Sequence, residues 1–177
     1  MDPYQEQVVR WTVRVSVTFY LVFLVVAFAS PDDRRASLLR LIWSLGLSFF
    51  LLHLLAAFQF VHNWSHQNAW DHTAEQTFEM TGLRWGGGVY FNYLFTVIWF
   101  FDVLLWWLKG SQWRTSHVSY RYFVHCYFAF IVFNATVVFG PLFWRYIAVG
   151  LGLWTVFTLL WKRGKGPPKL LIPPVDP

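Results

Sequence analysis

Charged side chains are scarce in this sequence of 177 residues. Asp, Glu, Lys and Arg together make up 13% of the chain, whereas a soluble domain carries roughly 25%. So few charges cannot cover a surface that faces water, but a surface that faces lipid does not need them. The composition therefore excludes an ordinary soluble domain and favours a chain embedded in a lipid bilayer.

Cysteine is almost absent too, since Cys126 is the only one. A single cysteine excludes an internal disulfide and any Cys-rich zinc or iron–sulfur site. The net charge of +5 does not indicate nucleic-acid binding, because the basic residues lie between apolar runs and form no continuous basic patch. We therefore expect no nucleic-acid partner.

Apolar residues are abundant, at 56% of the chain, and they fall into long runs. A helix needs roughly 20 apolar residues to cross the hydrocarbon core of a bilayer. Five segments approach this length: 12–29, 38–61, 89–108, 122–139 and 142–161. The sequence predicts an all-α, polytopic integral membrane protein with a bundle of five transmembrane helices over residues 1–165 and a Pro-rich tail over 166–177.

The Lys and Arg residues predict the orientation of this bundle. With five crossings, one side of the membrane receives ten of them and the other receives four: Arg10, Arg14, Arg84 and Arg145. Cytoplasmic loops carry the excess of Lys and Arg. We expect an inner membrane of bacterial type, with the N-terminus and the polar segment 62–88 outside and the C-terminus in the cytoplasm.

Histidine gathers in the predicted extracytoplasmic segment 62–88. Gly46 is the only Gly or Pro between Asp33 and Gly82, so we expect the helix over 38–61 to continue beyond the membrane. His62 and His66 are spaced i, i+4, which places them on one face of a helix. Imidazole is the commonest transition-metal ligand. The spacing predicts a site for Cu, Zn or Fe.

In this prediction the ligands are His62, His66 and His72, and Glu75 acts as a fourth ligand or a base. One alternative is a polar rim, in which the same side chains form hydrogen bonds at the membrane surface. The other is proton-dependent gating or catalysis.

Ionisable residues inside the predicted membrane segments need partners. A rise of about 1.5 Å per residue places Asp102 and His125 both about 20 Å below the outer surface. The matched depth predicts that they form a pair between neighbouring helices. This pair either holds the helices together or handles protons beside a cofactor.

His53 lies near the middle of the segment 38–61. An imidazole at this depth is a candidate for a hydrogen bond to another subunit or for a ligand of haem b, with His125 as the second axial ligand. The depths of the two residues differ by about 8 Å, which argues against the pair unless the helices tilt.

Asn92 and Asn134 fall about 5–8 Å below the outer surface. They either support a polar pocket beneath His62 and His66 or fasten their two helices together.

These features favour a small membrane protein that binds a transition metal or haem near its outer face, as a subunit of a redox complex. The alternative is a non-catalytic structural subunit, or scaffold, whose His, Asp and Asn residues only hold helices together. A transporter is a third class, but the chain lacks the broken-helix repeats expected of one. The expected partners are the lipid bilayer and either further copies of the chain or other subunits.

Overall fold

The computed structural model describes residues 2–29, 35–140 and 146. The described residues form five α-helices and one short π-helix, without a strand: α1 (Pro3–Ala29), α2 (Ala36–Phe60), α3 (His66–Thr81), α4 (Gly88–Ser116), α5 (Val118–Phe133) and η2 (Asn134–Val138). The predicted all-α class is confirmed. The predicted fifth crossing over 142–161 and the tail over 166–177 lie outside the described residues, so the count of five crossings stays a prediction.

Four stretches of the described helices are long and apolar enough to cross a membrane: Pro3–Ala27, Ala36–Phe60, Gly88–Trp113 and Val118–Val138. They match the first four predicted segments. The first stretch begins earlier than expected, because polar residues extend α1 outward. An ion pair between Glu6 and Arg10, spaced i, i+4, supports these added turns.

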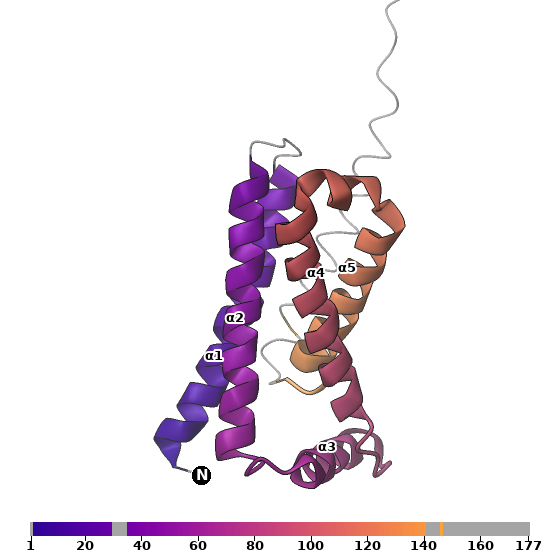
Figure 1. Ribbon diagram of the computed structural model, residues 1–177. Helices are drawn as coiled ribbons and strands as arrows, with labels where there is room; N and C mark the ends of the chain where they lie inside the picture. Colours follow the sequence, from indigo (N-terminus) through magenta and orange to yellow (C-terminus); the bar gives the residue numbers. More distant parts are fainter. Residues whose placement is uncertain (1, 30–34, 141–145, 147–177) are drawn as a thin grey trace, which may run out of the picture.

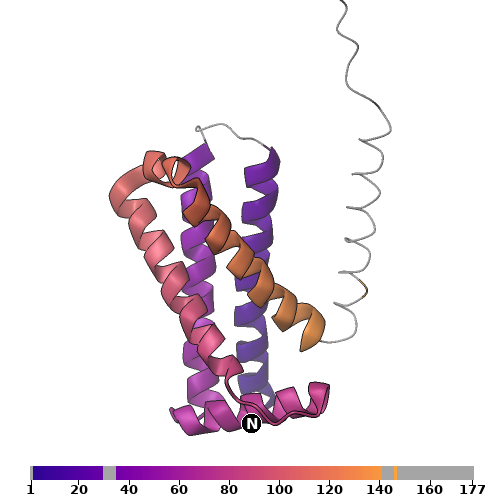
Figure 2. The ribbon, with the colours of Figure 1, turned by 90° about the vertical axis from the view of Figure 1, so that its right-hand side faces the viewer.

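The helices α1 and α2 lie side by side and antiparallel, and α4 packs beside α2 (Figure 1). The last helix, α5, is steeply inclined to the others (Figure 2). The hydroxyl of Ser16 donates to the Gly46 carbonyl across the α1–α2 contact, with 2.9 Å between the oxygens. A Cβ at Gly46 would lie 2.8 Å from the Trp99 ring. The bare glycine therefore permits close packing of α2 against both neighbours.

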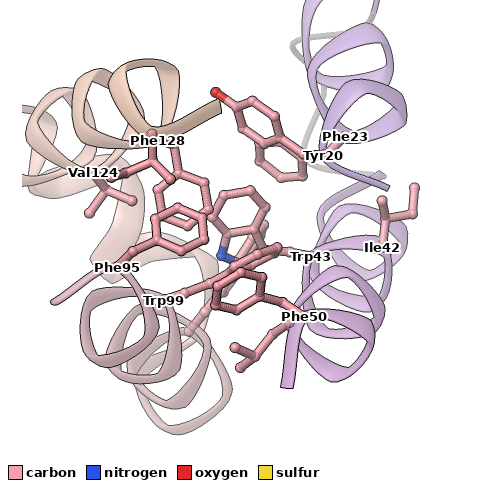
Figure 3. Close-up of a cluster of buried hydrophobic side chains, with 12 residues drawn as sticks. Tyr20, Phe23, Ile42, Trp43, Phe50, Phe95, Trp99, Val124 and Phe128 are labelled. Atoms are coloured by element: carbon pink, nitrogen blue, oxygen red, sulfur yellow. The ribbon is translucent and has the colours of Figure 1, made fainter. Parts of the chain in front are cut away.

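Aromatic rings fill the centre of the bundle (Figure 3). Trp43 of α2 is 1% exposed and contacts rings from all three neighbouring helices. Its ring centroid lies 4.6 Å from Phe23 on α1 and 4.8 Å from Phe128 on α5. Trp99 on α4 lies 5.2 Å away. The deep aromatic residues thus pack on one another, whereas Phe100, Phe101 and Trp107 are exposed on the outside of the bundle.

A sharp corner joins α4 to α5. The helix α4 is interrupted at Gly110, whose φ of 73° and ψ of −176° are not helical. The Trp106 indole donates across this break to the Ser111 hydroxyl, at 3.3 Å. The short helical piece after Gly110 runs across the end of the bundle, so the chain enters α5 in the opposite direction (Figures 1 and 2).

The predicted continuation of the second helix beyond the membrane is not confirmed. The helix α2 ends at Phe60, and a separate helix, α3, begins at His66. It lies across the end of the bundle where the N-terminus lies (Figure 1). The break does not need Gly or Pro, because Asn63 and Trp64 adopt positive φ values of 49° and 57°. We call α3 with the turn 61–65 and the loop 82–87 the cap.

Candidate functional site

The turn 61–65 decides where the histidines of the cap point. Ser65 is the N-cap of α3, and its side chain accepts a hydrogen bond from the Asn68 amide nitrogen at 3.2 Å. The Asn68 side chain donates back to the His62 carbonyl at 3.1 Å. These bonds fold α3 back beside the end of α2, as capping residues typically do at a helix start.

His62 consequently lies against His72, not against His66. The His62 and His72 rings meet edge to face, with their centroids 5.5 Å apart. Burial lowers the pKa of His62 below its ordinary value, and the nearby His72 and His53 lower this pKa further. The neutral imidazole is therefore the preferred form of His62.

His66 faces the first two turns of α4. Its Nδ1 lies 3.0 Å from the Tyr93 hydroxyl, and its Nε2 lies 3.5 Å from the Tyr90 hydroxyl. Two tyrosines thus occupy both ring nitrogens of His66. This His–Tyr cluster joins α3 to α4.

Glu75 points to another partner. Its carboxylate lies 3.7 Å from the Arg84 guanidinium in an exposed ion pair. The pair joins α3 to the loop that follows it. We expect it to contribute little to stability, since water screens exposed pairs.

The predicted metal site is therefore wrong. Within residues 2–29, 35–140 and 146, no group of three or more His, Cys, Asp or Glu side chains could hold a metal ion. The physical reason is the turn 61–65, which breaks the i, i+4 register assumed for His62 and His66. His62 is paired with His72, His66 with tyrosines and Glu75 with Arg84. The function predicted for this cluster, binding of a transition metal or haem through these residues in a redox complex, is therefore wrong.

Two glycines, Gly86 and Gly88, let the chain approach α3 closely at the start of α4. A Cβ at Gly86 would lie 2.5 Å from the Trp70 carbonyl oxygen, and one at Gly88 would lie 2.9 Å from the Thr73 methyl group. Side chains at these positions would force the cap away from the start of α4.

Asp102 lies deep in the bundle and is 1% exposed. The Trp43 indole donates to its carboxyl oxygen Oδ2 at 2.8 Å, which joins α2 to α4. His125 on α5 packs edge to face against the same Trp43 ring, with the centroids 5.7 Å apart. Asp102 and His125 thus share Trp43 as a neighbour. A direct or water-bridged contact between them stays a prediction.

His53 joins α2 to α1. Its Nδ1 lies 3.0 Å from the Val9 carbonyl oxygen. Since a carbonyl can only accept, Nδ1 carries the proton. A partner for His53 is therefore found in the backbone of α1. The pairing of His53 with His125 around haem b stays a prediction.

Asn134 bonds within its own helix, because its side-chain nitrogen donates to the Phe130 carbonyl at 2.8 Å. It stands at the start of η2, where the helix widens. Asn92 is exposed on α4. Arg145, which the sequence predicts on the same side of the membrane, lies outside the described residues.

The sequence identified the polar residues of the bundle but not the residues that they contact. Trp43 lies seven residues after the start of α2, and Asp102 lies seven residues before Lys109. Both positions are about 10 Å from the same end of the bundle by helical rise. The depth argument could therefore have paired them. The i, i+3 spacing of Tyr90 and Tyr93 was a weaker signal for their contact with His66.

These features define a helical bundle of membrane-spanning length, closed at one end by a polar cap. Comparison with known protein families, with curated proteins and with solved structures finds no match. The function must therefore be argued from the contacts of the bundle itself.

Proposed function

We propose that this chain is a non-catalytic structural membrane subunit. Its buried polar residues and the polar residues of the cap hold the helices together. The observation that carries this proposal is a set of hydrogen bonds between helices. They join Trp43 to Asp102 at 2.8 Å, Trp107 to Ser44 at 3.0 Å, Tyr127 to the Phe91 carbonyl at 2.9 Å, His53 to the Val9 carbonyl at 3.0 Å, Ser16 to the Gly46 carbonyl at 2.9 Å and His66 to Tyr93 at 3.0 Å.

These bonds link every described α-helix to a neighbour. In a bilayer, packing and interhelical hydrogen bonds replace the hydrophobic effect as the force between helices. Each such bond contributes about 0.6 kcal/mol on average. The set therefore contributes on the order of 4 kcal/mol, a large share of the stability of a small bundle.

The outer faces of the bundle support a role in assembly. Large apolar side chains are exposed along each spanning helix, including Val25 on α1, Leu55 on α2, Leu108 on α4 and Phe123 on α5. Lipid covers such faces in a single chain, and helices of a partner cover them in a complex. We propose that the subunit acts in a complex or a homo-oligomer through these faces.

The test distinguishes a chemical role of the imidazoles from a structural role of the same side chains. The triple variant His62→Gln, His66→Gln, His72→Gln keeps hydrogen-bonding side chains but removes the imidazoles. We expect it to accumulate in membranes and to restore the phenotype of cells that lack the chain. The matched control is Gly46→Leu, which should fail because its side chain collides with Trp99 and the protein is lost. A triple variant that is folded and abundant but fails to restore the phenotype would refute the structural role.

A further inference from the structure

Arg40 lies at the end of the bundle opposite the cap and has no anionic partner among the residues that the structure describes. It lies on α2, four residues after the helix begins, which is about 6 Å along the helix. No hydrogen bond or ion pair joins its guanidinium to another described residue, and its Nε is buried without an acceptor. A buried, unpaired donor of a charged group is costly, so the site favours an anion.

An exposed tryptophan holds this guanidinium in place. The guanidinium carbon of Arg40 lies 4.0 Å from the centroid of the Trp107 ring. The Trp107 indole donates to the Ser44 hydroxyl at 3.0 Å, and this hydroxyl donates to the Arg40 carbonyl at 2.8 Å. These contacts lock α2, α4 and the guanidinium into one arrangement.

Stacking on a ring uses the face of a guanidinium and leaves its edge available. The N–H donors lie in the plane of the group and match the oxygens of a phosphate. A preorganised arginine loses less side-chain freedom on binding, which favours affinity. The Arg40–Trp107 pair is therefore arranged to receive a phosphate group.

The surroundings identify the source of that phosphate. Trp107 is 53% exposed and Leu108 is 72% exposed, and Leu104 and Phe100 lie exposed on the same side of α4 as Trp107. Tryptophan is typical of the level of the lipid headgroups. A lipid bound with its headgroup at Arg40 would lay its acyl chain along the apolar side chains of α4.

The charge at this end complements an anionic lipid. The described helices place Arg35, Arg40, Lys109 and Arg121 here. Among the described residues, the one carboxyl group in this half of the bundle is the buried Asp102, which accepts from Trp43. The acidic residues of the cap and of the start of α1 lie at the other end (Figure 1).

We propose that Arg40 and Trp107 form a site for the headgroup phosphate of an anionic phospholipid, at the α2–α4 contact. The site concerns lipid recognition and stands apart from the structural role proposed above. Phosphatidylglycerol is the probe, and phosphatidylcholine with the same acyl chains is the zwitterionic comparison.

The experiment counts lipids retained by the full chain in native mass spectrometry from mixed detergent–lipid micelles. We expect the wild-type chain to retain phosphatidylglycerol in preference to phosphatidylcholine. Arg40→Gln should weaken this preference about fivefold, the effect typical of one arginine at an anionic surface. Arg121→Gln removes the same charge from the same end without touching Trp107, so it should leave most of the preference intact.

Trp107→Leu provides a second variant that keeps the charge of Arg40 but removes the ring that orients it, and it should also reduce the preference. The unfolding midpoint of each variant in detergent identifies any variant that has lost its fold. Equal losses in Arg40→Gln and Arg121→Gln would mean that binding follows net charge, and the proposal would be rejected. Retention unchanged by Arg40→Gln and Trp107→Leu, or full competition by inorganic phosphate, would also overturn it.

Discussion

Two residues in the centre of the bundle, Trp43 and Asp102, show how a polar group is accommodated deep in a membrane protein. A carboxyl group in hydrocarbon is costly unless a donor meets it. The indole of Trp43 supplies that donor while its ring packs on Phe23, Trp99 and Phe128. The Trp43 side chain thus donates a hydrogen bond to Asp102 and also packs against the apolar rings around it.

We expect Asp102→Val to be more destabilising than Asp102→Asn. Asparagine keeps an oxygen that can accept from the Trp43 indole, whereas valine leaves a buried donor without an acceptor, at a cost of about 1–3 kcal/mol. Chemical unfolding in detergent, followed by tryptophan fluorescence, measures the difference. Equal stability of the two variants would show that the hydrogen bond from Trp43 contributes nothing.

The lowered pKa of His62 predicts that the docking of α3 depends on pH. Its pKa is lowered in the folded chain by burial first, then by His72 and by His53. The facing groups are His72 on α3 and His53 within α2, and Phe58 packs against the His62 ring. The neutral form is favoured when α3 is docked, so the stabilisation is full above the ordinary histidine pKa of about 6.5. It is lost as the pH falls through the lowered pKa.

We therefore expect α3 to detach more readily at pH 5 than at pH 8. Hydrogen exchange of the α3 backbone at several pH values, corrected for intrinsic rates, measures this opening. His62→Gln should remove most of the pH dependence, whereas His117→Gln, at the opposite end of the bundle, should leave it unchanged. An opening that is the same at both pH values in the wild-type chain would contradict this account.

At the scale of the elements, two glycines end helical segments in different ways. Gly82 follows α3 with φ 74° and ψ 1°, the left-handed region that asparagine also tolerates. Gly110 interrupts α4 with φ 73° and ψ −176°, a region that is essentially restricted to glycine. A Cβ would meet no atom within 4 Å at either position. Any cost of substitution is therefore a cost of backbone conformation.

We expect Gly110→Asn to destabilise the chain by about 1–3 kcal/mol and Gly82→Asn by clearly less. The unfolding midpoints of the two variants in the same detergent provide the comparison. If Gly82→Asn were the more damaging change, the corner at Gly110 would not depend on its glycine.

At the scale of the whole molecule, the structure places the N-terminus and the cap at one end and the α4–α5 corner at the other (Figure 1). The excess of Lys and Arg at the corner end predicts that this end faces the cytoplasm. Which end faces the cytoplasm is a prediction from the sequence. That the N-terminus and α3 lie at the same end of the bundle is a property of the fold.

Cysteine labelling tests this orientation. In a Cys126→Ser background, we expect Glu6→Cys and Asp71→Cys to react with an impermeant reagent from outside the cell. Ser116→Cys should react only after the membrane is opened. Labelling of Ser116→Cys alone from outside would reverse the orientation, and labelling of all three from one side would contradict the bundle.

The order of apolar and polar stretches determined the helical class and the first four spanning helices. Burying a backbone in lipid leaves few alternatives to a helix of about 20 residues. Depth along a helix also follows from the sequence, because the rise per residue is constant. It brought Asp102 and His125 to the same level, where both contact Trp43.

Only the tertiary structure decided what the histidines do. The pairing of His62 with His72 depends on a left-handed backbone conformation at Asn63 and Trp64. Few sequence patterns predict this conformation for residues other than glycine. The partners of His53 and His66 are a backbone carbonyl and two tyrosines on other helices, and no local spacing relates these groups. Spacing describes one helix, whereas a binding site requires that several helices place their side chains at one point.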